Sequence, residues 1–201
     1  MRALLVDFGG VLTTNVFYSF RRFCEREGLD PEQVKRVFRE DPDALRDLRR
    51  LERGELSEDE FSERFGVRLG VEDTTDLVNR LFAEMGPDHA MIDAVKAARA
   101  AGVRTGLISN SWGSGRYDRS VFPELFDGVV ISGEVGLHKP QSEIYELGAE
   151  RVGVPAAECV FVDDLRENCE GAEAAGMTAV LHRGTEGTLP ELERLLGVAL
   201  R

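Results

Sequence analysis

Cysteine is scarce in this sequence, and long apolar runs are absent. The chain of 201 residues holds three cysteines, which lie far apart at Cys24, Cys159 and Cys169. An odd number without a CxxC pair indicates neither a disulfide framework nor a zinc site, and a reducing compartment fits best. The apolar run 3–6 is broken at Asp7, and no later stretch approaches the ~20 apolar residues that span a bilayer. The sequence therefore predicts a cytoplasmic protein without a membrane partner.

Positive charge is scarce as well. The chain has 25 Lys and Arg residues against 37 Asp and Glu residues, which gives a formal net charge of −12. A strongly acidic chain does not favour a broad face that binds phosphate backbones, so nucleic acid is not an expected partner. Only Lys35, Lys96 and Lys139 supply lysine. A lysine that falls within a motif therefore stands out.

Hydrophobic residues make up 42% of the chain and charged residues 31%, a balance typical of a globular protein with a core. Short apolar runs with β-branched residues predict buried strands. The strand patterns lie at 3–7, 103–109 and 158–163, with weaker ones at 128–131 and 178–181. Helical patterns lie between them at 88–101, 141–153, 165–176 and 189–199. This alternation predicts an α/β fold whose parallel sheet is covered on both faces.

Residues 15–86 break the alternation. They contain no strand pattern, and they show amphipathic helical spacing such as that of Val16, Phe20 and Phe23. An all-helical insertion into the sheet domain explains this change of pattern. The predicted division is a catalytic core of residues 1–14 and 87–201 with a helical cap of residues 15–86.

Polar side chains follow the predicted strands at the points where the strands end, and a later loop adds a lysine. In chain order these residues are Asp7, Ser109, Asn110, Lys139, Asp163 and Asp164. Ligands of open parallel sheets bind beyond the carboxyl ends of the strands, so we expect these side chains to lie close together. Each one alone has an ordinary explanation as a helix cap or turn residue. The ordered set predicts a site for a divalent cation and a phosphate.

The residue types indicate what each group does in such a site. The carboxylates of Asp7 and Asp164 are hard oxygen ligands that suit Mg²⁺, and Asp7 is also a candidate nucleophile. The Ser109 hydroxyl and the Asn110 amide can donate to phosphoryl oxygens. Lys139 supplies a compact positive charge to the same group.

The same residues lie in four short motifs that resemble those of the haloacid dehalogenase superfamily. The motifs are Asp7-Phe-Gly-Gly-Val-Leu12, Ser109-Asn110, Lys139-Pro140 and Asp163-Asp-Leu-Arg-Glu-Asn168. The resemblance covers essentially the whole chain, and the helical insertion looks like the cap that many members carry between the first and second motifs. It implies a Rossmann-like core and a phosphatase that acts on a small phosphorylated metabolite.

The resemblance also implies a mechanism. Asp7 would attack phosphorus and form an aspartyl-phosphate, with Mg²⁺ bound by Asp7, the backbone carbonyl of Gly9 and Asp164. Ser109 and Lys139 would hold the phosphoryl oxygens, and Lys139 would also steady the nucleophile. Asp163 and Asn168, two further residues of the last motif, would hold these groups in position without binding the cation themselves.

One motif position departs from the family pattern. Most phosphatases of the family carry a second Asp two residues after the nucleophile, which protonates the leaving group and later activates water, whereas this chain has Gly9. Loss of such a group typically removes ~10²–10⁴ in rate. Similar phosphatases with Asp-x-Gly occur in the branch that includes bacterial sugar-1-phosphate phosphatases. Phosphatase activity is therefore still expected, with a preference for good leaving groups.

Two other functions stay open at this point. One is a catalytically silent relative that binds a phosphorylated ligand or a partner, because the acid at position 9 is missing. The other is a 2-haloacid dehalogenase, since halide departure needs no acid, although adjacent carboxylates at Asp163 and Asp164 would repel each other without a cation. Near the second motif, Trp112, Arg116 and Tyr117 are placed either to reach a substrate or to pack over the sheet edge.

Overall fold

The computed structural model describes residues 1–113 and 117–201, and within these ranges five parallel strands form one sheet. The strands are β1 (Ala3–Val6), β2 (Arg104–Ser109), β3 (Gly128–Ile131), β4 (Cys159–Asp163) and β5 (Thr178–Leu181). Their order across the sheet is β3-β2-β1-β4-β5, and every neighbouring pair is parallel. The predicted α/β class and the strand positions are confirmed.

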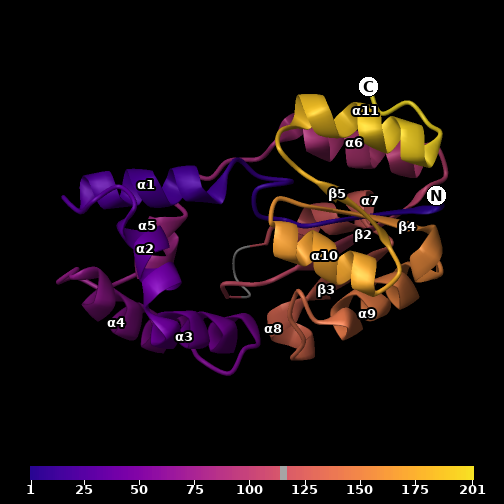
Figure 1. Ribbon diagram of the computed structural model, residues 1–201. Coiled ribbons are helices and arrows are strands. Elements are labelled where there is room, and N and C mark those ends of the chain that lie inside the picture. The colour runs from indigo at the N-terminus through magenta and orange to yellow at the C-terminus, as the bar shows by residue number, and fades with distance from the viewer. Residues whose placement is uncertain (114–116) are drawn as a thin grey trace.

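Helices cover both faces of the sheet, as Figure 1 shows. On one face lie α6 (His89–Ala100) and α11 (Thr185–Leu196), and on the other lie α9 (Ser142–Val152) and α10 (Arg166–Ala174). An apolar core lies on each face of the sheet, and alternate residues of the central strand β1 point into one core or the other. Leu4 and Val6 pack with α6 and α11, whereas Ala3 and Leu5 pack with α9 and α10. A strand buried on both faces explains why β1 is apolar at every position.

Some helix boundaries differ from the sequence-based expectation. Helix α11 begins at Thr185 rather than at 189 and holds Pro190 inside it. Its first turn is fixed by tertiary hydrogen bonds, from the Thr185 hydroxyl to Asp88 and between Thr188 and His182. The short helices α7 (Phe122–Leu125) and α8 (Ser132–Val135) were not expected. Among the described residues, none of the helices is long and apolar enough to cross a bilayer.

The insertion between β1 and α6 is helical throughout its regular structure and lies beside one end of the sheet (Figure 1). Its helices are α1 (Val16–Arg26), α2 (Gln33–Glu40), α3 (Pro42–Glu52), α4 (Glu58–Leu69) and α5 (Leu77–Leu81). These helices share an apolar cluster of their own, in which Phe23, Phe61 and Phe65 are fully buried. The helical insertion is therefore more than a long loop, because it has its own buried centre.

Hydrogen bonds hold the insertion against the sheet domain. Its entry and exit segments pair through an antiparallel bridge between Thr13 and Pro87. The end of α3 meets α8, where the Ser132 hydroxyl donates to the carbonyl of Glu52. The same Ser132 oxygen accepts from the backbone N–H of Ser111 at 2.8 Å. This chain of bonds connects α3 to the loop that follows β2.

An aromatic side chain makes a further connection. Trp112, in the loop after β2, contacts Phe20, Phe38, Phe61 and Phe82 of the insertion, with ring centroids between 5.0 and 5.8 Å apart. A residue of the sheet domain therefore belongs to the apolar cluster of the insertion. The loop after β2 and the insertion are held in one arrangement by this packing.

The close approach of α3 to α8 generates a stability prediction. Gly54 has φ +73°, and a Cβ there would lie 2.8 Å from the carbonyl oxygen of Gly133. Gly70 has φ +77° with open space around it, so it is a matched control. The positive φ costs about 1–2 kcal/mol in either Ala variant. We expect Gly54→Ala to lower the free energy of unfolding further than Gly70→Ala in denaturant titrations, and equal losses would contradict the close approach.

Candidate active site

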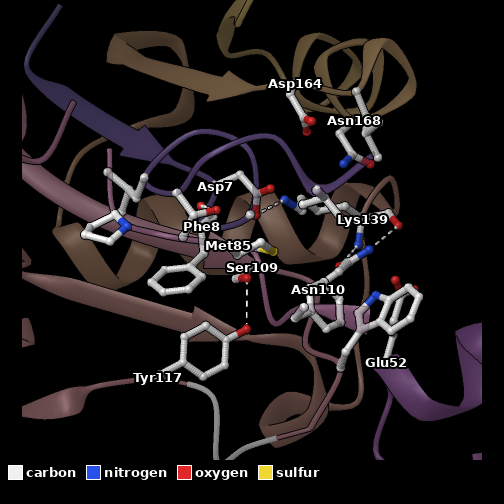
Figure 2. A pocket seen from close by; sticks show the side chains of 18 of the residues that line it. Asp7, Phe8, Glu52, Met85, Ser109, Asn110, Tyr117, Lys139, Asp164 and Asn168 are labelled. Atoms are coloured by element: carbon white, nitrogen blue, oxygen red, sulfur yellow. Dashed lines mark hydrogen bonds and ion pairs between the residues drawn. The ribbon is translucent and has the colours of Figure 1, made fainter. Parts of the chain in front are cut away.

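A cavity of about 970 Å³ lies at the carboxyl ends of the strands, between the sheet and the helical insertion. Figure 2 shows the polar side chains that gather there. All the predicted site residues except Asp163 line it directly; these are Asp7, Gly9, Ser109, Asn110, Lys139, Asp164 and Asn168. The topology therefore brings together the side chains that the sequence places far apart, and Asp163 lies just behind them.

Lys139 is the centre of the polar groups. Its Nζ lies 2.7 Å from Oδ1 of Asp7 and 2.7 Å from Oδ2 of Asp163, and the residue is only 3% exposed. Burial lowers the pKa of Lys139, but attraction to Asp163 and Asp7 outweighs burial, so that the pKa is raised above its usual value. The ammonium therefore keeps its charge at neutral pH.

The backbone of Lys139 is held by Asn110. Its N–H donates to Oδ1 of Asn110 at 2.9 Å, and Nδ2 of Asn110 donates back to the Lys139 carbonyl at 3.2 Å. The amide of Asn110 is therefore used to fix the lysine loop against the end of β2. This is a positioning role that its residue type alone did not indicate.

Asp163 is enclosed by donors. Its Oδ1 accepts from the backbone N–H of Leu165 at 2.8 Å and from Nδ2 of Asn168 at 3.0 Å, while Oδ2 accepts from Lys139. The carboxylate is fully buried. With its oxygens occupied in this way, Asp163 orients Lys139 and the first turn of α10 rather than facing the cavity.

Asp7 and Asp164 are less well compensated. Burial, together with the charges of Asp163 and Asp164, raises the pKa of Asp7 to about 7 against the lowering effect of Lys139. Burial and then the charge of Asp163 raise the pKa of Asp164 to about 6. The raised pKa values show that Asp7 and Asp164 lie among like charges and that the charge of Lys139 does not fully offset this repulsion and the cost of burial.

The arrangement fits a divalent cation. Carboxylate oxygens of Asp7, Asp163 and Asp164 all lie within 4.8 Å of one another. The backbone of Gly10 leaves room for this cluster, because a Cβ at that position would lie 2.5 Å from Oδ2 of Asp164. Hard oxygen ligands of this kind suit Mg²⁺, which takes one or two carboxylates together with water and substrate oxygens.

Ser109 is paired with Tyr117. The two hydroxyl oxygens lie 2.9 Å apart (Figure 2). Burial raises the pKa of Tyr117 to about 12 even though the hydrogen bond with Ser109 lowers it, so the phenol keeps its proton. A tyrosine that donates to Ser109 leaves the serine proton free for an oxygen of a ligand.

Three residues near the second motif were predicted either to reach a substrate or to pack locally. Tyr117 and Trp112 line the cavity, and each also packs locally, Tyr117 against Phe8 and Trp112 against the insertion. The two alternatives therefore do not exclude each other at these positions. Arg116 lies outside the described residues.

Gly9 leaves one side of the cavity without a side chain. Its φ is not in the left-handed region, and a Cβ there would meet only Cγ2 of Val16, at 3.3 Å. The backbone therefore accepts a larger residue with a small adjustment of Val16. Glycine at this position is not required by the conformation of the chain.

Sequence reasoning missed Glu52, the last residue of α3, which also lines the cavity. The only local signal is its spacing after Leu45 and Leu48, which puts a carboxyl on the apolar stripe of an amphipathic helix. It missed the apolar walls as well. Representative apolar residues of the lining are Phe17, Phe20, Leu45 and Leu48 from the insertion and Val121 and Phe122 from the sheet domain.

Comparison with known proteins places these features in a family. A family model described as haloacid dehalogenase-like hydrolase matches residues 1–176. The sesquiterpene phosphatase astK of Aspergillus oryzae is 28% identical over 152 residues, which cover 73% of this chain and 78% of that protein. The bifunctional epoxide hydrolase 2 of Rattus norvegicus is 27% identical over 130 residues. These cover 61% of this chain and 24% of the rat protein, so the chain spans about a quarter of that relative's length.

Solved structures show the same fold. A protein from Porphyromonas gingivalis described as a HAD-like family hydrolase has a TM-score of 0.71 and 26% identity, with 98% of both chains covered. A HAD family enzyme from Bacteroides thetaiotaomicron, solved with magnesium and inorganic phosphate, has a TM-score of 0.63 and 20% identity. That match covers 91% of this chain and 94% of the other.

The raised pKa values generate a prediction about stability. Between pH 3.8, the ordinary pKa of an aspartate, and about 7 the folded state holds a proton on Asp7 that the unfolded state has released. Stability from this group is therefore lost as pH rises through that window, and Asp164 acts in the same direction up to about pH 6. We expect Asp164→Asn to make the fall in Tm across pH 4–7 shallower in buffer without divalent cations.

The exposed Asp59 of α4 is the matched control, and Asp59→Asn should keep the wild-type slope. Addition of Mg²⁺ should raise the Tm of the wild-type protein more at pH 8 than at pH 5, because protons compete with the cation for the same carboxylates. An unchanged slope in Asp164→Asn would contradict the assigned repulsion.

Proposed function

The chain belongs to the haloacid dehalogenase-like hydrolase family, and we propose that it is a Mg²⁺-dependent phosphatase that acts on a small organic phosphate monoester through an aspartyl-phosphate. The observation that carries this proposal is the arrangement around Lys139, whose Nζ contacts Asp7 at the end of β1 and Asp163 at the end of β4. Asp164 adds a further carboxylate beside them. A nucleophile, a fixed positive charge and an oxygen-rich cation site meet at one sheet edge.

The chemistry follows from these groups. An oxygen of Asp7 attacks phosphorus, the bond from phosphorus to the alcohol oxygen breaks, and an aspartyl-phosphate results. Lys139 and the Ser109 hydroxyl hold the phosphoryl oxygens during the transfer. Asn110 donates one Nδ2 hydrogen to the Lys139 carbonyl, and its second Nδ2 hydrogen donates to the phosphoryl group. Water then attacks phosphorus, releases inorganic phosphate and restores Asp7.

Asp7, Asp164 and the backbone carbonyl of Gly9 are the groups that we assign to Mg²⁺. The bound cation would neutralise charge that develops on the phosphoryl oxygens. Asp163 and Asn168 act behind these groups, because their mutual hydrogen bonds keep Lys139 and the first turn of α10 in place. The Bacteroides thetaiotaomicron enzyme of the same fold was solved with magnesium and inorganic phosphate, which supports magnesium as the cation.

We assign residues 15–86 the role of a cap over the site and residues 1–14 and 87–201 the role of the catalytic core. The cap contributes most of the apolar roof of the cavity. A covered cavity excludes water from the reacting groups and selects the alcohol portion of the substrate.

The cavity walls favour an apolar alcohol. Phe17, Phe20, Leu45 and Leu48 of the insertion line the cavity above the polar groups, whereas a sugar would need several hydrogen-bond partners there. The relative named a sesquiterpene phosphatase supports an alcohol of hydrocarbon character. The proposed substrate is therefore a phosphate ester whose carbon skeleton is mainly hydrocarbon.

The carboxylate cluster favours phosphoryl transfer over the alternatives. Hydrolysis of a carbon–halogen bond needs no cation, and without one Asp7 and Asp164 would repel each other beside the reacting carbon. A protein that only binds a phosphorylated ligand has no need for a nucleophile in contact with Lys139.

The nucleophile is tested by Asp7→Asn. We expect loss of steady-state phosphate release from every ester by at least ~10³-fold, because the amide cannot attack phosphorus, while the Tm in Mg²⁺-free buffer stays near that of the wild type. Asp59→Asn, a change of the same kind on the exposed face of α4, should keep full activity. Steady-state phosphate release by pure Asp7→Asn protein would show that Asp7 is not the nucleophile.

The substrate class is tested with a panel of phosphate esters in the presence of Mg²⁺. We expect kcat/KM to be ~10–100-fold higher for prenyl and benzyl phosphates than for hexose 6-phosphates, since each buried CH₂ contributes about 0.8 kcal/mol. All of these are esters of primary alcohols, so the comparison isolates the carbon skeleton. A preference for the sugar phosphates would overturn the apolar assignment and leave the phosphatase proposal standing.

A further inference from the structure

We propose that the carboxyl group of Glu52, carried by α3 of the insertion, is the general acid and base of this site and replaces the side chain that Gly9 lacks. The inference rests on the proposed phosphatase function. It assigns the proton transfer to the cap, whereas the nucleophile and the phosphate-binding groups belong to the sheet domain.

The first support is position. Glu52 is the last residue of α3 and lines the same cavity as Asp7 and Lys139. Leu45, Leu48 and Glu52 lie at helical spacing, so that α3 presents its apolar residues and then this carboxyl to the cavity. Figure 2 shows Glu52 reaching the pocket from the ribbon of α3.

The second support is the way in which this residue is held. The Glu52 carbonyl accepts from the Ser132 hydroxyl, and that oxygen accepts from the backbone N–H of Ser111 at 2.8 Å. Gly54, two residues later, packs against the backbone of Gly133. The main chain of Glu52 is thus fixed to the sheet domain beside the loop that follows Ser109, so the side chain starts from an anchored backbone position at the cavity.

The third support is the lack of another task for this carboxyl. Within residues 1–113 and 117–201 it has no hydrogen-bond or ion-pair partner, although it is partly buried. Its neighbour Glu55 is exposed and bonded to Arg53 at 2.6 Å. A carboxyl that lines a cavity beside a nucleophile and makes no structural bond is available for proton transfer.

Burial keeps the Glu52 carboxyl protonated. Burial raises the pKa of Glu52 to about 8. Lys139 and Arg49 lower it, whereas Asp7 on β1 and Glu167 on α10 raise it. At neutral pH the larger part of the population therefore holds the proton that a general acid must give.

Three other groups of the cavity that could carry a proton, on Lys139, Tyr117 and His138, already have hydrogen-bond or ion-pair partners. The Lys139 ammonium is held between two carboxylates, and the Tyr117 hydroxyl is paired with Ser109. Nδ1 of His138 lies 2.8 Å from the carbonyl of Lys139. Their existing bonds make them poorer donors to a leaving group than Glu52, whose carboxyl has no hydrogen-bond or ion-pair partner in the part of the chain that the structure describes.

The proton balance of the two steps is simple. In the first step an Asp7 oxygen bonds to phosphorus, the bond to the alcohol oxygen breaks, and the Glu52 proton moves to that oxygen and releases the neutral alcohol. In the second step the Glu52 carboxylate takes a proton from water while the water oxygen bonds to phosphorus. The bond from phosphorus to Asp7 breaks, phosphate leaves, and both side chains regain their starting states.

The test compares Glu52→Gln with the wild-type protein on two esters of similar size in the presence of Mg²⁺. Benzyl phosphate has a poor leaving group that needs a proton, and 4-nitrophenyl phosphate has a good one that does not. We expect kcat/KM of Glu52→Gln to fall by ~10²-fold or more for benzyl phosphate and by less than ~10-fold for the nitrophenyl ester. The matched control is Glu55→Gln, which should leave both rates unchanged.

The pH profile gives an independent readout. In the wild-type protein the ratio of the benzyl to the nitrophenyl rate should fall as pH rises through about 8, because Glu52 loses its proton, and in Glu52→Gln the ratio should not change there. Glu52→Asp, which keeps an acid on a shorter stem, should retain part of the benzyl rate. If Glu52→Gln fails to fold, the benzyl rate of Glu52→Asp and the pH profile of the wild-type protein still test whether Glu52 is the general acid.

A rescue completes the experiment. Gly9→Asp in the Glu52→Gln background should restore benzyl phosphate turnover by at least ~10-fold, since only Cγ2 of Val16 stands close to the new Cβ. Equal slowing of both esters by Glu52→Gln, or no slowing of either, would overturn the assignment while wild-type turnover upheld the phosphatase. If the wild-type protein released phosphate from neither ester but still bound Mg²⁺, the proposed function itself would fail and the Glu52 assignment with it.

Discussion

The buried ammonium of Lys139 is the interaction on which the site depends. It lies between the carboxylates of Asp7 and Asp163, which end two neighbouring strands, and Asn110 holds its backbone from a third strand. Removing the ammonium from this buried group would leave two carboxylates uncompensated, which costs ~3–5 kcal/mol. The ammonium therefore offsets part of the repulsion between the carboxylates at this sheet edge, and the negative charge that remains favours a divalent ion.

The loop after β2 extends this arrangement to the insertion. Ser109 faces the cavity, Ser111 bonds through Ser132 to the end of α3, and Trp112 packs in the aromatic cluster of the insertion. One short segment thus positions the Ser109 hydroxyl and the apolar roof of the cavity at the same time. A carboxyl on α3 can therefore line the same cavity as the polar groups of the sheet edge, because the loop after β2 fixes the position of both.

Most of the core and of its polar edge could be predicted from the chain. Strands such as β1 and β4 are apolar runs that end in aspartates, and parallel topology brings their ends together whatever the details of packing. The start of α11 was predicted wrongly, because Pro190 masks a first turn that tertiary bonds to Asp88 and His182 hold in place. Local pattern predicts an element well only where local interactions decide it.

The sequence by itself determined the α/β class, the helical nature of the insertion and the set of strand-end groups that includes Asp7 and Lys139. Only the tertiary structure decided which insertion residues line the cavity with Asp7, and that Glu52 is among them. Helical periodicity defines a stripe on α3 but does not say what the stripe faces. That orientation comes from contacts between residues distant in sequence, the bond from Ser132 to Glu52 and the packing of Trp112, because a helix is placed by the surfaces it packs against.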